Sequence, residues 1–215
     1  MADYKIVYSG GSDEIVEKKS RFIANVFSVS TEEEVLQIIE DTRKKYWDAR
    51  HNCYAYVIGN NDEITRCSDD GEPSGTAGRP ILEVITGSGI HNALIIVTRY
   101  FGGTLLGTGG LVRAYSKSAQ AGIVASKVVI RENGRKASIK TDYNGIGKIQ
   151  YIAGSMEINT LDTDYSDIVK IELLVPEDKV ETLVNKVTEA SSGRAVIDIG
   201  DELYFSVVDG VSVIL

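Results

Sequence analysis

The chain has 215 residues, of which 43% are hydrophobic and 25% are charged, with 21 Gly, 3 Pro and 2 Cys. These values exclude a collagen, a disulfide scaffold and a wholly disordered chain. The net charge of −8 excludes a globally basic nucleic-acid-binding protein, because such proteins neutralise phosphates with Lys and Arg. Any contact with nucleic acid is therefore expected to be local.

The chain also lacks the patterns that would direct it to a membrane. Its longest apolar run, residues 93–97, is far shorter than the roughly 20 residues needed to cross a bilayer. Residues 1–16 show no basic start followed by an apolar core. We therefore expect a cytoplasmic protein without a membrane partner, in which Cys53 and Cys67 stay reduced.

Charge is spread unevenly and predicts two domains. Residues 1–136 hold 17 Lys/Arg and 17 Asp/Glu, whereas residues 137–215 hold 6 Lys/Arg and 14 Asp/Glu. The C-terminal part therefore accounts for the whole net charge of −8. A polar, Gly-containing stretch at residues 131–135 is typical of a turn. The predicted domains are residues 1–133 and 134–215, with a linker at residues 131–135.

The N-terminal part mixes strands and helices. Residues 21–29 predict a strand, and Ser30 and Thr31 with Glu33 and Glu34 three residues later predict a helix start. That helix is expected to end at the cationic residues 43–45. Two strands at residues 53–58 and 64–67 predict a hairpin, residues 93–100 a buried central strand, and residues 111–122 a further helix.

The C-terminal part has a simpler order. Strands are predicted at residues 137–141, 157–161 and 169–175 and from residue 195 onward, and helices at residues 146–153 and 180–187. This is the βαββαβ order of a ferredoxin-like fold. The predicted fold class is therefore α+β with two domains. No cluster of titratable residues occurs in this part, so we expect it to serve in docking.

An acidic loop, residues 66–80, has a composition that packing alone does not require. It holds Asp69, Asp70 and Glu72 together with Arg66 and Arg79. The carboxylates could bind a cation or act as general acid and base, and residues 74–78 could present backbone N–H groups to an anion. The alternative is a solvated loop that precedes a helix.

A Gly-rich segment, residues 98–113, runs from a strand through a loop into a helix. Glycines let the backbone approach a ligand closely, and a helix N-terminus favours an anion. Arg113 is expected in the first turn of the helix, where a cation is unfavourable unless an anion or a carboxylate offsets it. Either a phosphate binds there, or Arg113 pairs with Asp69 or Asp70.

A zinc site was the weakest alternative. If the hairpin is centred on Asn60, Cys53 faces Cys67 and His51 faces Asp69, which brings together zinc-ligand types. A slip of one residue would scatter them, and the Cys-x-x-Cys spacing of strong zinc signals is absent. The prediction is therefore no metal and no cofactor.

Three motifs together resemble the signature of the YigZ/IMPACT family. They are residues 51–56 (HNCYAY), 68–80 (SDDGEPSGTAGRP) and 97–115 (VTRYFGGTLLGTGGLVRAY). The resemblance implies an N-terminal α/β sandwich like the second domain of a small-subunit ribosomal protein, and a C-terminal domain like the last domain of elongation factor G. Eukaryotic relatives regulate translation by competing for the activator of a kinase that phosphorylates an initiation factor. Bacterial members lack that pathway, so the implied role is translation-linked.

The resemblance implies binding residues but no catalytic ones. At Leu105 the chain departs from relatives, which often have Lys there. The binding residues that the motifs and their glycines imply are Arg21, His51, Arg66, Asp69, Asp70, Glu72, Ser74, Thr76, Arg79, Arg99, Tyr100, Gly102, Gly103, Gly109, Gly110 and Arg113.

The leading hypothesis is a non-enzymatic protein that binds RNA, the ribosome or a ribosome-associated protein through its N-terminal loops, with Arg79, Arg99 and Arg113 as contacts. DNA is not an expected partner, and the oligomeric state stays open. The alternative is a hydrolase-type enzyme for a phosphorylated or peptidic small molecule, with Asp69 or Asp70 as base. The two differ in whether the acidic loop is engaged by Arg99 and Arg113 or free to act.

Overall fold

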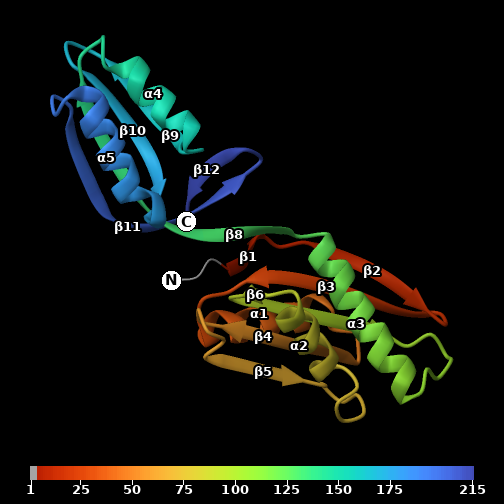
Figure 1. Cartoon of the computed structure of the whole chain (residues 1–215). Helices are drawn as coiled ribbons and strands as arrows, with labels where there is room; N and C mark the ends of the chain where they lie inside the picture. Colours follow the sequence, from red (N-terminus) through yellow and green to blue (C-terminus); the bar gives the residue numbers. More distant parts are fainter. Residues whose placement is uncertain (1–3) are drawn as a thin grey trace. The chain divides into compact units, whose positions relative to one another are not determined.

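The computed structural model describes residues 4–215 and divides them into two compact units, Tyr4–Val129 and Ile130–Leu215 (Figure 1). Each unit buries apolar clusters of its own. None of the helices in residues 4–215 is both long and apolar enough to cross a bilayer.

The boundary between the two units, after Val129, lies close to the predicted linker, but the turn predicted at residues 131–135 is wrong. These residues lie inside a continuous strand, β8 (Lys127–Thr141), in which the two units join. Gly134 serves close packing and not a turn, because a Cβ atom there would lie 2.5 Å from the Val175 carbonyl oxygen and 2.7 Å from the ring of Phe205. A strand glycine can mark such a close approach as well as a break in the strand.

The N-terminal unit is built on a five-stranded antiparallel sheet. Its strand order is β2 (Ser12–Glu17), β3 (Ser20–Ser28), β7 (Ala93–Tyr100), β4 (His51–Ile58) and β5 (Ile64–Ser68). All residues of the central strand β7 except Tyr100 are buried, which confirms the prediction for this apolar run. Two further strands, β1 (Tyr4–Ser9) and β6 (Ile90–His91), pair in parallel.

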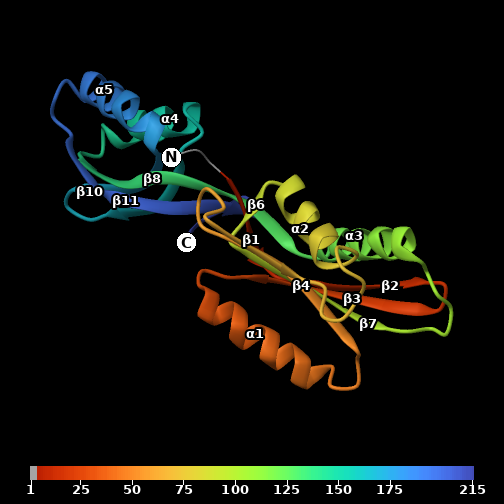
Figure 2. The ribbon, with the colours of Figure 1, turned by 90° about the horizontal axis from the view of Figure 1, so that it is seen from below.

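Helices cover both faces of this sheet. Helix α1 (Glu32–Lys45) lies on one face, and α2 (Gly78–Gly87) and α3 (Thr108–Val124) lie on the other (Figure 2). Alternate residues of β3 serve the two faces: Phe22 and Ala24 belong to the core under α2 and α3, whereas Phe27 packs against the core under α1. The result is an α/β sandwich, as the resemblance implied.

The start of α1 follows its predicted caps. The Glu34 N–H donates to Thr31 Oγ1 at 3.2 Å, and the Ser30 N–H donates to Glu34 Oε2 at 2.7 Å. Helix α2 is the helix that one interpretation of the acidic loop placed after it, but its bounds were not predicted, because Gly78, Pro80 and Gly87 within it are residues typical of turns. Its burial of Ile81 and Ile85 in the core supplies the stabilisation that helix propensity does not.

The C-terminal unit has the predicted ferredoxin-like order. Its elements after β8 are α4 (Ile146–Ser155), β9 (Asn159–Tyr165), β10 (Val169–Pro176), the 3-10 turn Glu177–Lys179, α5 (Val180–Ser191), β11 (Val196–Val208) and β12 (Val211–Ile214). Strand β8 lies between β10 and β11, and β9 pairs with β10. The extra strand β12 was not predicted; it forms a hairpin with β11 through Asp209 and Gly210, both at positive φ, a pair typical of tight hairpin turns.

Candidate functional site

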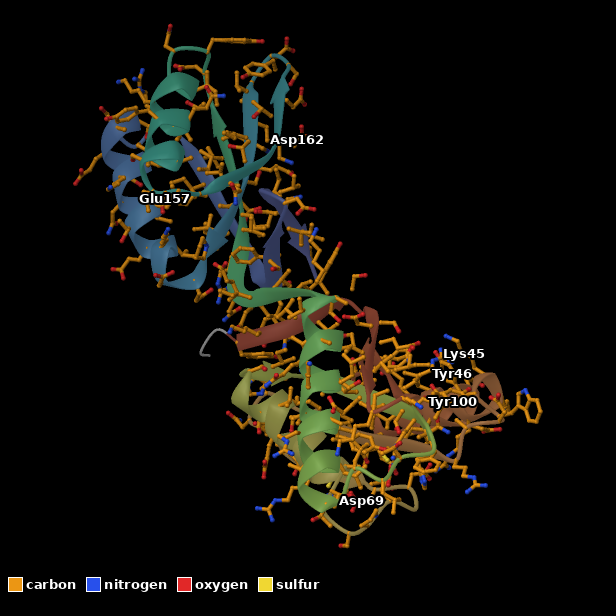
Figure 3. The ribbon with its side chains drawn as sticks, turned by 90° about the vertical axis from the view of Figure 1, so that its right-hand side faces the viewer. Lys45, Tyr46, Asp69, Tyr100, Glu157 and Asp162 are labelled. Carbon is orange, nitrogen blue, oxygen red and sulfur yellow. The ribbon has the colours of Figure 1, made fainter. Side chains whose placement is uncertain are left out.

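Asp69 anchors the acidic loop to the start of α2. Its carboxylate accepts hydrogen bonds from the backbone N–H groups of Gly75 at 2.8 Å, Ala77 at 2.9 Å and Gly78 at 2.9 Å. Partial burial works to raise the pKa of Asp69, but the three N–H donors outweigh it and hold the pKa below its ordinary value. Figure 3 labels this side chain. Asp69 therefore holds the loop in shape as a carboxylate.

Asp70 ties the same loop to α1 and β4. Its Oδ1 lies 2.8 Å from Arg43 Nη2, and its Oδ2 accepts from the Asn52 N–H at 2.7 Å. The backbone of Asp70 has a positive φ of 40°, and its carbonyl oxygen lies 2.9 Å from His51 Nδ1. Both the carboxylate and the neighbouring imidazole are thus engaged in holding the loop.

Glu72 forms a buried ion pair with Arg99. Arg99 Nη1 lies 2.6 Å from Glu72 Oε1, and the two side chains are only 7% and 4% exposed. Tyr115 donates its hydroxyl to the same oxygen at 2.8 Å, and the Arg99 guanidinium lies over the rings of Phe22 and Phe101. This cluster joins the acidic loop to the Gly-rich segment inside the unit, so Arg99 positions the loops from within.

The thiol of Cys53 completes the buried cluster. Its Sγ lies 3.0 Å from the Asp69 carbonyl oxygen and 3.3 Å from the Tyr115 hydroxyl. Burial raises the pKa of Cys53 to about 12, and burial with the neighbouring Cys53 and Glu72 also raises the pKa of Tyr115. Both groups are therefore protonated at neutral pH and have no nucleophilic character.

The ligands of the zinc alternative do not come together. Ala55 pairs with Cys67 and Tyr54 with Ser68, so the partner of Cys67 lies two residues along β4 from Cys53. Cys53 is buried and Cys67 is exposed. Across residues 4–215, no group of three or more His, Cys, Asp or Glu side chains is arranged to hold a metal ion.

The other candidate residues lie on the surface or in turns. Arg21 makes a two-pronged contact with Glu14 and lies over the Tyr100 ring, whose hydroxyl donates to Asp48 at 2.7 Å. The remaining side chains are distributed as follows: Arg79 pairs with Glu83, Arg66 donates to the Thr65 carbonyl oxygen, Thr76 donates to the Pro73 carbonyl oxygen, and Ser74 is exposed.

The glycines of the Gly-rich segment meet different structural requirements. Gly102 lies against the β2–β3 turn, where a Cβ atom would come within 2.0 Å of the Lys19 carbonyl carbon. Gly103 has a positive φ of 82°. Gly109 and Gly110 form the first turn of α3, which starts at Gly107 with no side-chain cap. A glycine at this position offers the first N–H groups of the helix no side-chain acceptor.

Beside this helix start lies a cavity of about 200 Å³, hereafter the basic cavity. It is lined by Glu17, Lys18, Leu106, Gly110, Arg113, Ala114 and Lys117. Arg113 and Lys117 lie one turn apart on α3, and Lys18 comes from the β2–β3 turn. Within residues 4–215, none of these three cations forms an ion pair or hydrogen bond. Arg113 thus pairs with neither Asp69 nor Asp70.

Sequence reasoning found Arg113 but missed its two cationic neighbours. Lys117 could have been found from its spacing of four residues after Arg113 on a predicted helix. Lys18 is far away in sequence and joins the cavity only through the packing of α3 against β2. No local signal identifies it.

Two family models match the chain: the Impact N-terminal domain over residues 18–123, and a domain of unknown function (DUF1949) over residues 139–194. The chain is 42% identical over 201 residues to the IMPACT family member YvyE of Bacillus subtilis (strain 168), which covers 94% of this chain and 93% of that protein. The chain belongs to the IMPACT family. This confirms the resemblance seen in its motifs.

The chain is also similar to further IMPACT family members and to a solved structure. YigZ of Escherichia coli (strain K12) is 34% identical over 178 residues, covering 82% of this chain and 87% of that protein. Protein IMPACT of Mus musculus is 36% identical over 98 residues, but this covers only 30% of the mouse protein. A structure titled "Crystal structure of an hypothetical protein" is 31% identical, has a TM-score of 0.60, and covers 92% of this chain.

The family match and the site coincide along the chain. The region that matches the Impact N-terminal domain contains the acidic loop, the Gly-rich segment and every lining residue of the basic cavity except Glu17. In this IMPACT family member the Gly-rich segment, α3 and the β2–β3 turn thus line a cavity with three unpaired cations.

Proposed function

We propose that this protein is a non-enzymatic, translation-linked regulator in the cytoplasm that binds RNA through the basic cavity. The observation that carries the proposal is the convergence of three cations, Arg113, Lys117 and Lys18, against one lining carboxylate, Glu17, with which none of them forms an ion pair, beside a helix start without a side-chain cap. The lining therefore carries an excess of positive charge, which a phosphate group can neutralise.

The chemistry of the three cations suits a backbone phosphate. The guanidinium of Arg113 can grip two phosphate oxygens, and the ammonium groups of Lys117 and Lys18 add point charges. The net charge of the whole chain is −8, so attraction to RNA has to come from such a local concentration of cations. The contact is to phosphate and is therefore expected to be independent of sequence.

The acidic loop supports binding over catalysis. A general base needs a carboxylate that is free to reach a substrate proton. Asp69 is held by backbone N–H groups, Asp70 by Arg43, and Glu72 by Arg99 and Tyr115. The hydrolase-type alternative therefore has no observation in its favour. Membership of the IMPACT family, which includes the eukaryotic IMPACT proteins, supports a regulatory role.

Binding of a fluorescent single-stranded RNA tests this proposal. The double variant Arg113→Ala with Lys117→Ala is expected to bind at least about tenfold more weakly than the wild type, since two charged contacts are lost. The matched control is Lys44→Ala with Lys186→Ala, which removes the same charge from exposed helix positions. If the control pair weakens binding as much as the cavity pair, the RNA surface lies elsewhere.

A further inference from the structure

A second cavity lies on the other face of the same sheet, between β3 and α1. It has a volume of about 300 Å³ and is lined by Asn25, Phe27, Ile38, Asp41, Thr42, Lys45 and Tyr46. The basic cavity, in contrast, lies on α3, on the opposite sheet face. We call the second one the α1 cavity; nothing in the proposed phosphate contact uses it.

The unusual residue of the α1 cavity is Asn25. Its side chain is on the α1 face, because its neighbours Ala24 and Val26 belong to the core on the other face. Asn25 is only 7% exposed, and its Nδ2 group has no hydrogen-bond partner anywhere in residues 4–215. A buried donor without an acceptor destabilises a protein, so native structures satisfy nearly all of them. This amide donor lines a cavity in which a ligand could accept its hydrogen bond.

The walls of the cavity suit a planar ring. Phe27 and Ile38 are apolar side chains that pack against the core under α1, and Tyr46 adds an aromatic ring at the end of that helix. The hydroxyl of Thr42, which is 6% exposed, offers a second polar group. A volume of about 300 Å³ is at the lower end for ligand pockets, which favours one small ring system over a larger molecule.

The cavity lining carries one cation, Lys45, and one carboxylate, Asp41, which Lys44 and Gln37 engage. Lys45 Nζ lies 4.9 Å from the centre of the Tyr46 ring, and Figure 3 shows both residues at the same end of the N-terminal unit as Tyr100. The next residue, Trp47, is the single Trp of the chain and is 82% exposed. Aromatic rings beside a cation are the usual means of binding unstacked nucleotides.

We propose that the α1 cavity binds the heterocyclic base of one unpaired RNA nucleotide. The base ring packs against Phe27 and Tyr46, an acceptor on its edge takes the Asn25 amide hydrogen, and Lys45 faces the attached phosphate. An Asn amide can recognise a base edge with its donor and its acceptor together. The inference rests on the RNA binding proposed above but uses a different surface, so the two can fail separately.

Uncharged nucleosides test this base contact without any phosphate. Adenosine, guanosine, cytidine and uridine are titrated into the ¹⁵N-labelled protein, with the side-chain amide signal of Asn25 and Trp47 fluorescence as readouts. At least one nucleoside is expected to shift that signal saturably, with a Kd in the millimolar range typical of a small ring. Its 5′-monophosphate is expected to bind several-fold more tightly than the nucleoside. The Lys45→Gln variant is expected to lose this extra affinity for the monophosphate but to bind the nucleoside like the wild type.

Two variants separate the base contact from the phosphate contact. Asn25→Leu removes the unpartnered amide, so it is expected to raise the Tm while weakening nucleoside binding at least about tenfold. Arg113→Ala with Lys117→Ala is expected to leave nucleoside binding unchanged. An Asn25→Leu variant that binds nucleosides like the wild type would overturn the proposal.

The remaining outcomes are equally decisive. If no nucleoside binds while RNA binding still depends on Arg113, the base contact is refuted and the phosphate contact stands. If mononucleotides bind but single-stranded oligonucleotides do not compete for the α1 cavity, the cavity belongs to a free small molecule and the RNA assignment is refuted.

Discussion

Glu72 Oε1 accepts hydrogen bonds from both the Arg99 guanidinium, at 2.6 Å, and the Tyr115 hydroxyl, at 2.8 Å, in the interior of the N-terminal unit. Glu72→Gln leaves the Arg99 charge without its buried partner, so we expect the free energy of unfolding to fall by about 3–5 kcal/mol. Urea unfolding followed by circular dichroism measures this loss.

The exposed pair of Glu14 with Arg21 is the matched control. These side chains are 37% and 51% exposed, so Glu14→Gln is expected to cost less than about 1 kcal/mol. Equal losses for the two variants would show that Glu72 is not the structural anchor described above.

Asp69 makes the stability of the protein depend on pH, and the sign of this dependence follows from the direction of its pKa shift. Its pKa is lowered in the folded state, so its stabilising effect is present above the ordinary pKa of about 4 and is lost as the pH falls through the lower folded value. Asp69→Asn is therefore expected to reduce stability by about 1–2 kcal/mol at pH 7. Unfolding at pH 7 and pH 3 is expected to show this difference shrinking in acid; a difference that grows in acid would contradict the assignment.

The two cysteines are expected to react at very different rates. Only a thiolate that a disulfide reagent can reach reacts with that reagent. Burial raises the pKa of Cys53 to about 12 and hides its sulfur; partial burial and Asp69 also raise the pKa of Cys67, but this residue is exposed. At pH 8, one thiol per chain should react promptly and the second only after denaturation. Cys67→Ser should abolish the prompt reaction. Prompt reaction of both thiols would contradict the burial of Cys53.

The features of the fold that could be predicted are those that depend on residues close together in the sequence. The capping residues of α1, the apolar run that becomes β7 and the βαββαβ order of the C-terminal unit all follow from nearest neighbours and periodicity. Gly134 was misread because a glycine that permits close packing and a glycine that makes a turn have the same local sequence signal.

The contacts of the candidate site depend on tertiary structure. In the β4–β5 hairpin Cys67 pairs with Ala55 and not with Cys53, a shift of two residues that keeps each side chain on its face but changes its partner. That Glu72 engages Arg99, while Arg113 stays unpaired, is set by how the acidic loop packs between β4 and α3. The sequence identified the arginines but not which of them faces a ligand.

Each unit buries apolar clusters of its own, and the charge difference between the two parts led us to expect separate folding. Residues 1–133 and 134–215 expressed apart are each expected to unfold cooperatively. Thermal melts of both pieces and of the whole chain measure this. A non-cooperative melt of the N-terminal piece would show that the boundary in β8 is misplaced.

The most direct test of the central claim is the salt dependence of RNA binding by the wild type and by the Arg113→Ala, Lys117→Ala double variant. Each lost phosphate contact on a single strand is expected to reduce the slope of log K against log salt concentration by about 0.7. The proposal predicts weaker binding with a flatter slope for the double variant and no change of slope for Lys44→Ala with Lys186→Ala. Equal slopes for the wild type and the double variant would contradict a phosphate contact at the basic cavity.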